Sequence, residues 1–339
     1  MLTRRLTLAG ALALAVAVPF VIPAAAQDAT TKIPVVASFS ILGDFVKEVG
    51  GDRVEVTTLV GPNGDAHVFQ PAPGDAKKVS AAQIVFVNGL GFEGWIDRLV
   101  KASGTKAEIV VATKGVTPRE MADEDEDEHD HAAHDHGKDH KDHDHDDHAK
   151  TDGHDHDHAG HDHGGTDPHA WQSVANAQIY VANIRDALIA ADPAGKAAYE
   201  ANAAAYTAKL QALDAEVKAA VANIPEKNRR IITSHDAFGY FGAAYGVEFI
   251  APQGVSTDSE ASAKDVARII RQIKAENIPA VFMENISDPR LVKRIAKETK
   301  AKVGGELFSD ALSDDKGPAS TYIDMMKNNV AQLSSALSS

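Results

Sequence analysis

The sequence predicts an α/β fold of two lobes, each built on a parallel sheet, with one long helix between them. Two observations support this prediction. Short apolar runs alternate with helical patterns in both halves of the chain, and an unbroken apolar stripe of helical spacing separates the halves. Strands that alternate with helices pair in parallel and are covered on both faces. Without the first 26 residues and one highly charged tract, about 270 residues remain, which is enough for two lobes of ordinary size.

The first residues have the composition of an export signal. Arg4 and Arg5 precede the apolar run Leu6–Ile22, and Ala24–Ala26 supplies a small-residue cleavage pattern. We expect residues 1–26 to be removed and the rest to be exported, most simply to a bacterial periplasm, by either the Sec or the twin-arginine route. The chain contains no cysteine, which excludes disulfides and thiolate ligands. We therefore also expect a protein that is not a lipoprotein.

Residues 27–192 are expected to form the first lobe. Val35–Phe39 and Val54–Val60 are apolar enough to be strands, and a Gly-Pro-Asn-Gly turn ends the second of them. Further strands are expected at Ile84–Val87 and Ile109–Val111, and helices at Ile41–Val49, Asp75–Ala82, Phe92–Ala102 and Trp171–Ala190.

Residues 193–224 are expected to form the long helix that links the lobes. Asp192 suits the N-cap position, Pro193 suits the first helical position, and Pro225 stops the helix. Apolar residues recur in steps of three and four along the whole segment. A helix of this length spans roughly 48 Å, longer than one small lobe is wide. We therefore expect a rigid strut that crosses between the lobes, with a helix lying on one lobe as the alternative.

Residues 225–339 repeat the alternation and are expected to form the second lobe. Strands are expected at Arg230–Thr233, Val247–Ile250 and Ala280–Met283, with a short one from Val303. Helices are expected at Ala237–Tyr245, Ser262–Glu276 and Asp288–Lys300, with a last one after Pro318. Ser262 should cap its helix, with Asp265 in the first turn.

Between Met121 and Pro168 the chain consists mostly of aspartate, glutamate and histidine. The segment from Asp123 to His163 has 17 acidic residues and three lysines, so it carries nearly all of the net charge of −15. It has too few apolar residues to offset the entropy of ordering, so we expect a disordered loop over residues 122–165. The charge also excludes nucleic acid as a partner.

This tract holds most of the histidines of the chain. They are His129, His131, His134, His136, His140, His143, His145, His148, His154, His156, His158, His161 and His163. Imidazoles two residues apart can share a soft divalent ion, and interleaved carboxylates raise the local cation concentration. We expect the tract to collect metal ions weakly; a solvated acidic linker is the alternative.

The three remaining histidines lie where strands end or helices begin. His67 follows the strand Val54–Val60, His235 follows Arg230–Thr233, and His169 directly precedes a helix. Ligands of parallel sheets bind beyond the carboxyl ends of the strands. We therefore expect the three imidazoles to face one cleft and to bind a metal ion, with a carboxylate completing four-coordination. Position alone leaves five carboxylates open: Asp236, Asp258, Glu284, Asp288 and Asp310.

Five motifs in the chain resemble those of the periplasmic zinc and manganese receptors of ABC importers. They are Val36–Leu42, Gly64–Pro71, Asp167–Trp171, Ser234–Phe238 and Gly305–Asp310, and the resemblance covers nearly the whole mature chain. It implies two Rossmann-like lobes joined by a rigid helix, with a metal ion held between them. It also implies four ligands: His67, His169, His235 and Asp310. The His-rich insertion is similar to that of the zinc receptors. An ABC transporter permease is the implied partner, a periplasmic metallochaperone is a further candidate, and a monomer is expected.

The donor set favours zinc. Three imidazoles and one carboxylate suit Zn²⁺, whereas Mn²⁺ prefers oxygen. The resemblance also implies a carboxylate at the position of His235 in manganese receptors. We therefore expect a non-enzymatic protein that captures Zn²⁺ and delivers it to a permease.

Two other classes remain open. One is a stand-alone zinc buffer or chaperone. The other is a secreted zinc hydrolase with Asp236 or Glu284 as its base. Against the hydrolase, the sequence has no His-Glu-x-x-His motif, and Asp310 would fill the coordination position that a catalytic zinc keeps open.

Overall fold

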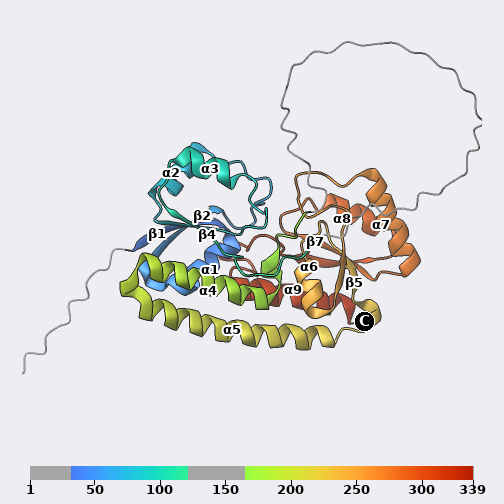
Figure 1. Cartoon of the computed structure of the whole chain (residues 1–339). Helices are drawn as coiled ribbons and strands as arrows, with labels where there is room; N and C mark the ends of the chain where they lie inside the picture. Colours follow the sequence, from blue (N-terminus) through green and yellow to red (C-terminus); the bar gives the residue numbers. More distant parts are fainter. Residues whose placement is uncertain (1–31, 121–164, 339) are drawn as a thin grey trace, which may run out of the picture. The chain divides into compact units, whose positions relative to one another are not determined.

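The computed structural model describes residues 32–120 and 165–338, and Figure 1 shows the order of their helices and strands. The expected signal segment 1–26 lies outside the described residues. The thirteen histidines of the tract lie outside them as well. The expectations for both segments therefore stay predictions.

The first lobe contains a four-stranded, all-parallel sheet in the order β2-β1-β3-β4. Its strands are β1 (Ile33–Phe39), β2 (Val54–Val60), β3 (Ile84–Val87) and β4 (Glu108–Val111). Its helices are α1 (Ser40–Gly50), α2 (Pro73–Ala81), α3 (Ile96–Ser103) and α4 (Val174–Ala191), with a 3₁₀ turn at Gly51–Arg53. Helices α1 and α4 lie on one side of the sheet and α2 and α3 on the other (Figure 1). Strand β1 is therefore covered on both faces, which explains its nearly continuous apolar sequence.

The second lobe repeats this arrangement in a parallel sheet of order β6-β5-β7-β8. Its strands are β5 (Arg230–Ile232), β6 (Glu248–Ile250), β7 (Ala280–Glu284) and β8 (Lys302–Leu307). Its helices are α6 (Gly239–Tyr245), α7 (Ala263–Glu276), α8 (Arg290–Glu298) and α9 (Tyr322–Leu337), with a 3₁₀ turn at Glu226–Asn228. The predicted α/β class with two parallel sheets is confirmed.

The long helix between the lobes is α5 (Lys196–Ala222), preceded by a 3₁₀ turn at Pro193–Gly195. It packs against α1 and α4 of the first lobe and against α6 and α9 of the second. The predicted apolar stripe is its buried face, made of Tyr199, Ala203, Tyr206, Leu210, Leu213, Val217 and Val221. A helix that contacts both lobes restricts how far they can separate. Among the described residues, no helix combines the length and apolar character needed to cross a bilayer.

Asp192 and Pro193 occupy the predicted places at the start of this helix: Asp192 is the N-cap residue of the 3₁₀ turn and Pro193 is the first residue of that turn. Asp192 Oδ2 also accepts hydrogen bonds from Arg53 Nε (2.8 Å) and Tyr199 Oη (3.0 Å). The bond from Arg53 is charge-assisted and therefore stronger than a bond between neutral groups. Ser262 caps α7 as predicted and accepts from the Asp265 amide.

Several hydrogen bonds join the two lobes close to the ends of their strands. The Asn63 amide donates to the Leu312 carbonyl (2.8 Å), and the Leu312 amide donates to Ser40 Oγ (2.9 Å). The Tyr322 amide, at the start of α9, donates to Asp44 on α1 (2.9 Å). One buried apolar cluster also runs from β1 to α9. The lobes therefore share a core, and the loops after β2 and β8 are held against each other.

Candidate metal centre

Four side chains from four separate loops meet between the lobes. His67 lies between β2 and α2, and His169 directly precedes the 3₁₀ turn Ala170–Gln172. His235 follows β5, and Asp310 follows β8. One ligand atom from each residue lies within 4.8 Å of the others. The structure thus brings together the three histidines outside the tract and one of the five candidate carboxylates.

The distances within this cluster suit a single small cation. His67 Nε2 lies 3.3 Å from His169 Nε2 and 3.2 Å from Asp310 Oδ2. His235 Nε2 lies 3.1 Å from the same Oδ2, and His169 Nε2 lies 3.5 Å from Asp310 Oδ1. Ligands about 2.0–2.1 Å from a tetrahedral ion lie about 3.3–3.4 Å from one another. These four contacts, at 3.1–3.5 Å, therefore lie close to the separation expected of ligands that share one ion.

Carboxylates behind the imidazoles fix which ring nitrogen faces the centre. Oδ1 of Asp167 lies 2.9 Å from His169 Nδ1 and accepts from the His169 amide at 3.0 Å. Oε2 of Glu284 lies 2.6 Å from His235 Nδ1, and its Oε1 accepts from the amides of Ser234 and His235. A carboxylate at Nδ1 keeps the proton there and leaves Nε2 free for a metal. Both rings therefore turn Nε2 toward the centre.

Burial and charge set the protonation of the centre in the absence of metal. Burial lowers the pKa of His169, but the negative charges of Asp310 and Asp167 outweigh burial and raise this pKa to about 9. Burial likewise lowers the pKa of His235, and Glu284 and Asp310 raise it well above its usual value. Burial raises the pKa of Asp310, but the two imidazoles hold it well below its usual range. A divalent ion can thus replace two imidazole protons beside a permanent carboxylate.

Access to the centre lies on the His67 side. The other three side chains are fully buried, whereas His67 keeps 5% of its side chain exposed. His67 also lines a cavity of about 440 Å³ together with Phe92, Pro168 and Asp258. Phe92 packs edge-on against the His67 ring, at 4.8 Å between centroids. An ion that approaches through this cavity therefore meets His67 first.

The remaining candidate carboxylates lie outside the four-residue cluster. Glu284 contacts His235 from behind the ring, so it orients the imidazole. Asp258 lies at the wall of the cavity beside His67. Asp288 is exposed and bonded to Arg290, and Asp236 lines a different cavity.

Two positioning interactions were not anticipated from the sequence. Asn88 donates from Nδ2 to the Pro168 carbonyl at 2.9 Å and accepts from Tyr180 Oη. Trp171 and Gln172 both donate to the Ser309 carbonyl, at 2.9 and 2.7 Å. These contacts hold the backbone directly beside His169 and Asp310. Pro168 and Trp171 belong to the motif Asp167–Trp171 that the sequence shows. Their hydrogen-bond partners lie 80 and 138 residues away in the chain, so no local pattern indicates them.

The chain matches known metal-binding proteins over most of its length. Residues 35–336 match the ZnuA family, described as "Zinc-uptake complex component A periplasmic". The manganese-binding lipoprotein MntA of Halalkalibacterium halodurans is 32% identical over 307 residues, covering 90% of this chain and 89% of MntA. The iron-binding protein YfeA of Yersinia pestis is 31% identical over 304 residues, covering 90% and 86%.

Solved structures match as well. The periplasmic zinc-binding protein TroA of Treponema pallidum gives a TM-score of 0.75 at 26% identity, covering 91% of this chain and 100% of TroA. A manganese-bound periplasmic metal-binding protein of Candidatus Liberibacter asiaticus gives 0.72 at 28% identity, with the same coverage. The relatives thus share the fold but are named for different metals.

The comparisons correct one part of the predicted localisation. MntA and the streptococcal relatives SsaB, FimA and PsaA are all named as lipoproteins. The expectation that this protein is not a lipoprotein was drawn from the lack of cysteine and is contradicted by these relatives. The lack of one residue type does not carry a conclusion about membrane attachment, and we withdraw that expectation.

Family membership also decides between the functional classes. Members of this family are solute-binding receptors rather than enzymes, which sets aside the zinc hydrolase. They bind a metal ion outside the cytoplasm and pass it to the permease of an ABC importer. The fold, the four converging side chains and the match over residues 35–336 lead to the same conclusion: this chain belongs to the ZnuA family of periplasmic metal-binding receptors of ABC importers.

Proposed function

We propose that this receptor carries Zn²⁺ and that His67, His169, His235 and Asp310 are its ligands. The observation that supports this most is the convergence of three imidazole nitrogens and a carboxylate, each with one ligand atom within 4.8 Å of the others. Structural zinc sites use four such ligands and leave no open position, which suits a protein that holds an ion as cargo. The proposed division is a first lobe at 27–192, a linking helix at 193–224 and a second lobe at 225–339.

The choice of zinc rests on the chemistry of the donors. Relatives are named for manganese, iron and zinc, so the family leaves the metal open. Imidazole nitrogen binds Zn²⁺ more strongly than Mn²⁺, which lies at the weak end of the affinity order for divalent ions. A set of three nitrogens and one oxygen therefore favours Zn²⁺ over Mn²⁺, which lies several places lower in that affinity order.

Manganese is the second candidate, and one observation favours it. Oδ1 of Asp310 is buried and has no hydrogen-bond partner among the described residues, and it lies 3.5 Å from His169 Nε2. Both oxygens of Asp310 therefore face the imidazoles. A bidentate carboxylate would raise the oxygen count of the site, which suits Mn²⁺ better than a single oxygen does.

The His-rich tract is proposed to collect zinc for this centre. A free imidazole has a reference pKa of about 6.5, so a substantial share of imidazole is neutral at pH 7 and able to bind metal. The tract rejoins the described chain at Gly165, four residues before His169. Deleting Asp123–His163 should leave one tight site with nearly unchanged affinity and remove several weak ones. If the deletion abolishes tight binding, the tract supplies a primary ligand; if the stoichiometry is unchanged, it collects nothing.

Zinc titration of single variants tests the proposed ligands. His235→Ala and Asp310→Asn should each weaken the tight site by several orders of magnitude, because each leaves three ligands. Asp288→Asn is the matched control, since that carboxylate is exposed and bonded to Arg290. Tight binding retained by His235→Ala, with the control behaving as wild type, would show that the ligand set is wrong.

A further inference from the structure

The two ends of the His-rich insertion are joined to each other by a short stem, which we define as Arg119, Glu120, Thr166 and Asp167. Glu120 and Thr166 form an antiparallel bridge, and the Asp167 amide donates to the Arg119 carbonyl at 2.8 Å. The stem thus places an arginine at one end of the insertion directly beside an aspartate at the other end.

Asp167 joins this stem to the metal centre. Its side chain is fully buried, and its Oδ1 contacts both the amide and Nδ1 of His169 at 3.0 and 2.9 Å. Its Oδ2 is buried and makes no hydrogen bond among the described residues. The guanidinium of Arg119 approaches this second oxygen, with Nη1 at 3.6 Å. Arg119 is therefore a cationic neighbour of the carboxylate that orients His169.

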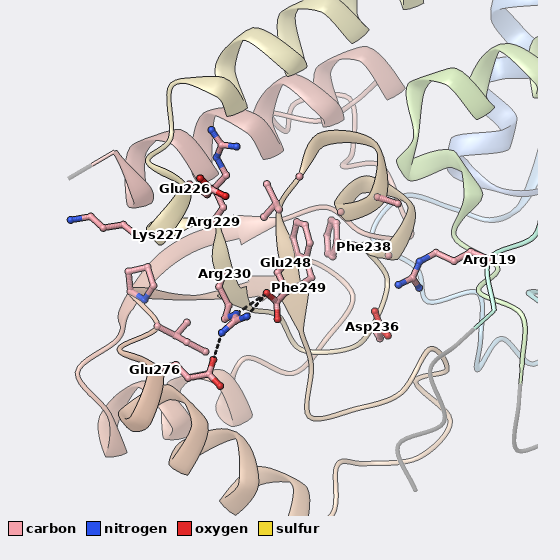
Figure 2. A pocket seen from close by; sticks show the side chains of 17 residues that line it. Arg119, Glu226, Lys227, Arg229, Arg230, Asp236, Phe238, Glu248, Phe249 and Glu276 are labelled. Atoms are coloured by element: carbon pink, nitrogen blue, oxygen red, sulfur yellow. Dashed lines mark hydrogen bonds and ion pairs between the residues drawn. The ribbon is translucent and has the colours of Figure 1, made fainter. Parts of the chain in front are cut away.

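Arg119 also contacts the second lobe. Its amide donates to Tyr240 Oη at 2.9 Å. A methyl group added at Gly239 would collide with both Arg119 Nη1 and Asp167 Oδ2, so the start of α6 lies directly against this pair. Figure 2 shows Arg119 and Asp236 at the edge of a cavity of about 690 Å³ that the second lobe forms. The guanidinium thus contacts Asp167, while Asp236 lines the same cavity.

We propose that Arg119 is a positioning residue for the metal centre and acts on His169 through Asp167. The guanidinium holds the carboxylate so that Oδ1 stays on His169 Nδ1, which keeps the ring proton on Nδ1 and the Nε2 lone pair toward the ion. Because the Arg119 amide donates to Tyr240 and its guanidinium approaches Asp167, the stem, the second lobe and His169 are connected at one point. This inference rests on the proposed role of His169 as a ligand.

The test is Arg119→Gln in the full mature chain, with two readouts. One is the absorption spectrum of the Co²⁺-loaded protein, which reports ligand geometry. The other is the rate of zinc loss to a chelator. Loss of a group that orients a metal ligand typically weakens the site by 10–100-fold. We expect zinc loss to be faster by a factor in this range, with a changed Co²⁺ spectrum, and substantial recovery of both in Arg119→Lys, which restores the positive charge.

Arg230→Gln is the matched control. Arg230 lines the same cavity but is bonded to Glu248 and Glu276, away from the centre. It should leave both readouts at their wild-type values. The inference is overturned if Arg119→Gln behaves as wild type, if Arg230→Gln has the same effect, or if Arg119→Lys recovers nothing.

A variant at His169 separates this inference from the proposed function. If His169→Ala keeps its tight zinc, the ligand set itself fails, and the positioning role fails with it. If His169→Ala loses zinc while Arg119→Gln matches wild type, only the role of Arg119 is refuted. Loss of zinc in the first variant and faster release in the second supports both.

Discussion

The indole nitrogen of Trp171 donates a 2.9 Å hydrogen bond to the carbonyl oxygen of Ser309, and this bond joins the two lobes one residue before Asp310 and two residues after His169. Trp171 is fully buried and packs against Phe39 and Phe92. The contact therefore sets the distance between a histidine of the first lobe and the carboxylate of the second.

Trp171→Phe tests this relationship. The change removes the hydrogen bond and part of the buried ring, so we expect a loss of about 1–3 kcal/mol in the free energy of unfolding. Zinc affinity should fall about 3–30-fold, because Asp310 is less firmly held. Chemical denaturation and calorimetric titration measure the two effects. Tyr199→Phe is the control: it removes a bond to Asp192, far from the centre, and should lower stability without changing zinc affinity.

Metal binding should release protons. In the metal-free protein the pKa of His169 is raised to about 9 and that of His235 lies well above its usual value, so both imidazoles are protonated at pH 7. A metal ion must displace these protons, so apparent affinity should rise with pH at least up to about 9, the pKa of His169. Calorimetry at pH 7 in buffers of different ionisation enthalpy should show one to two protons released per zinc. A heat of binding that does not depend on the buffer contradicts the assigned protonation.

The partly buried carboxyl of Asp44 gives a separate pH dependence of stability. Burial raises its pKa to about 6 in the folded protein, above the ordinary value of 3.8. The folded state therefore binds this proton more tightly than the unfolded state, and stability is lost as pH rises from about 4 to above 6, by about 2–3 kcal/mol. Asp44→Asn should be more stable than wild type by this amount at pH 8 and nearly equal at pH 4. Its amide oxygen can still accept from Tyr322.

Melting temperatures of the metal-free proteins at both pH values check the Asp44 prediction. Asp97→Asn, at an exposed aspartate of α3, is the control and should change stability by less than about 1 kcal/mol at either pH. An Asp44→Asn variant that is equally stable or less stable than wild type at pH 8 would show that burial of this carboxyl is not the source of the effect.

Metal preference should follow the number of imidazoles. His235→Glu would convert the donor set to two nitrogens and two carboxylates and shift preference toward Mn²⁺. The structure adds a condition: Glu284 lies 2.6 Å from the His235 ring, so a new glutamate would face a buried like charge. We therefore expect the double variant His235→Glu/Glu284→Gln to show the shift and the single variant to be destabilised. Glu284→Gln alone controls for the lost carboxylate. An unchanged zinc-to-manganese ratio in the double variant would contradict the argument from donor softness.

The sequence predicted those features that depend on local pattern. The apolar runs of β1 and β3 and the three-and-four spacing of α5 arise from burial of one strand or one helix face, so they are visible without the fold. The three isolated histidines were visible for a similar reason, because each stands beside the end of a strand or the start of a helix.

Features that depend on distant partners could not be predicted in this way. Asp310 was chosen among five carboxylates only through family resemblance, because its position depends on Ser309 meeting Trp171 and Leu312 meeting Ser40. Asp192 is the N-cap residue that the local pattern predicts, but its bond to Arg53, 139 residues away, could not be read from that pattern. The carboxylate of Asp167 gains its role from the His169 ring and from Arg119, which approaches from the other end of the insertion.

Competition between zinc and manganese for the intact mature protein tests the central proposal most directly. Native mass spectrometry after exposure to equal concentrations of both ions, followed by dialysis against a weak chelator that strips the His-rich tract, measures which ion the tight site retains. We predict one Zn²⁺ per chain, and none in His235→Ala treated in the same way. Retention of Mn²⁺ in the wild type, or of one tightly held Zn²⁺ in His235→Ala, would contradict the proposal of a zinc receptor with three histidines and one aspartate as ligands.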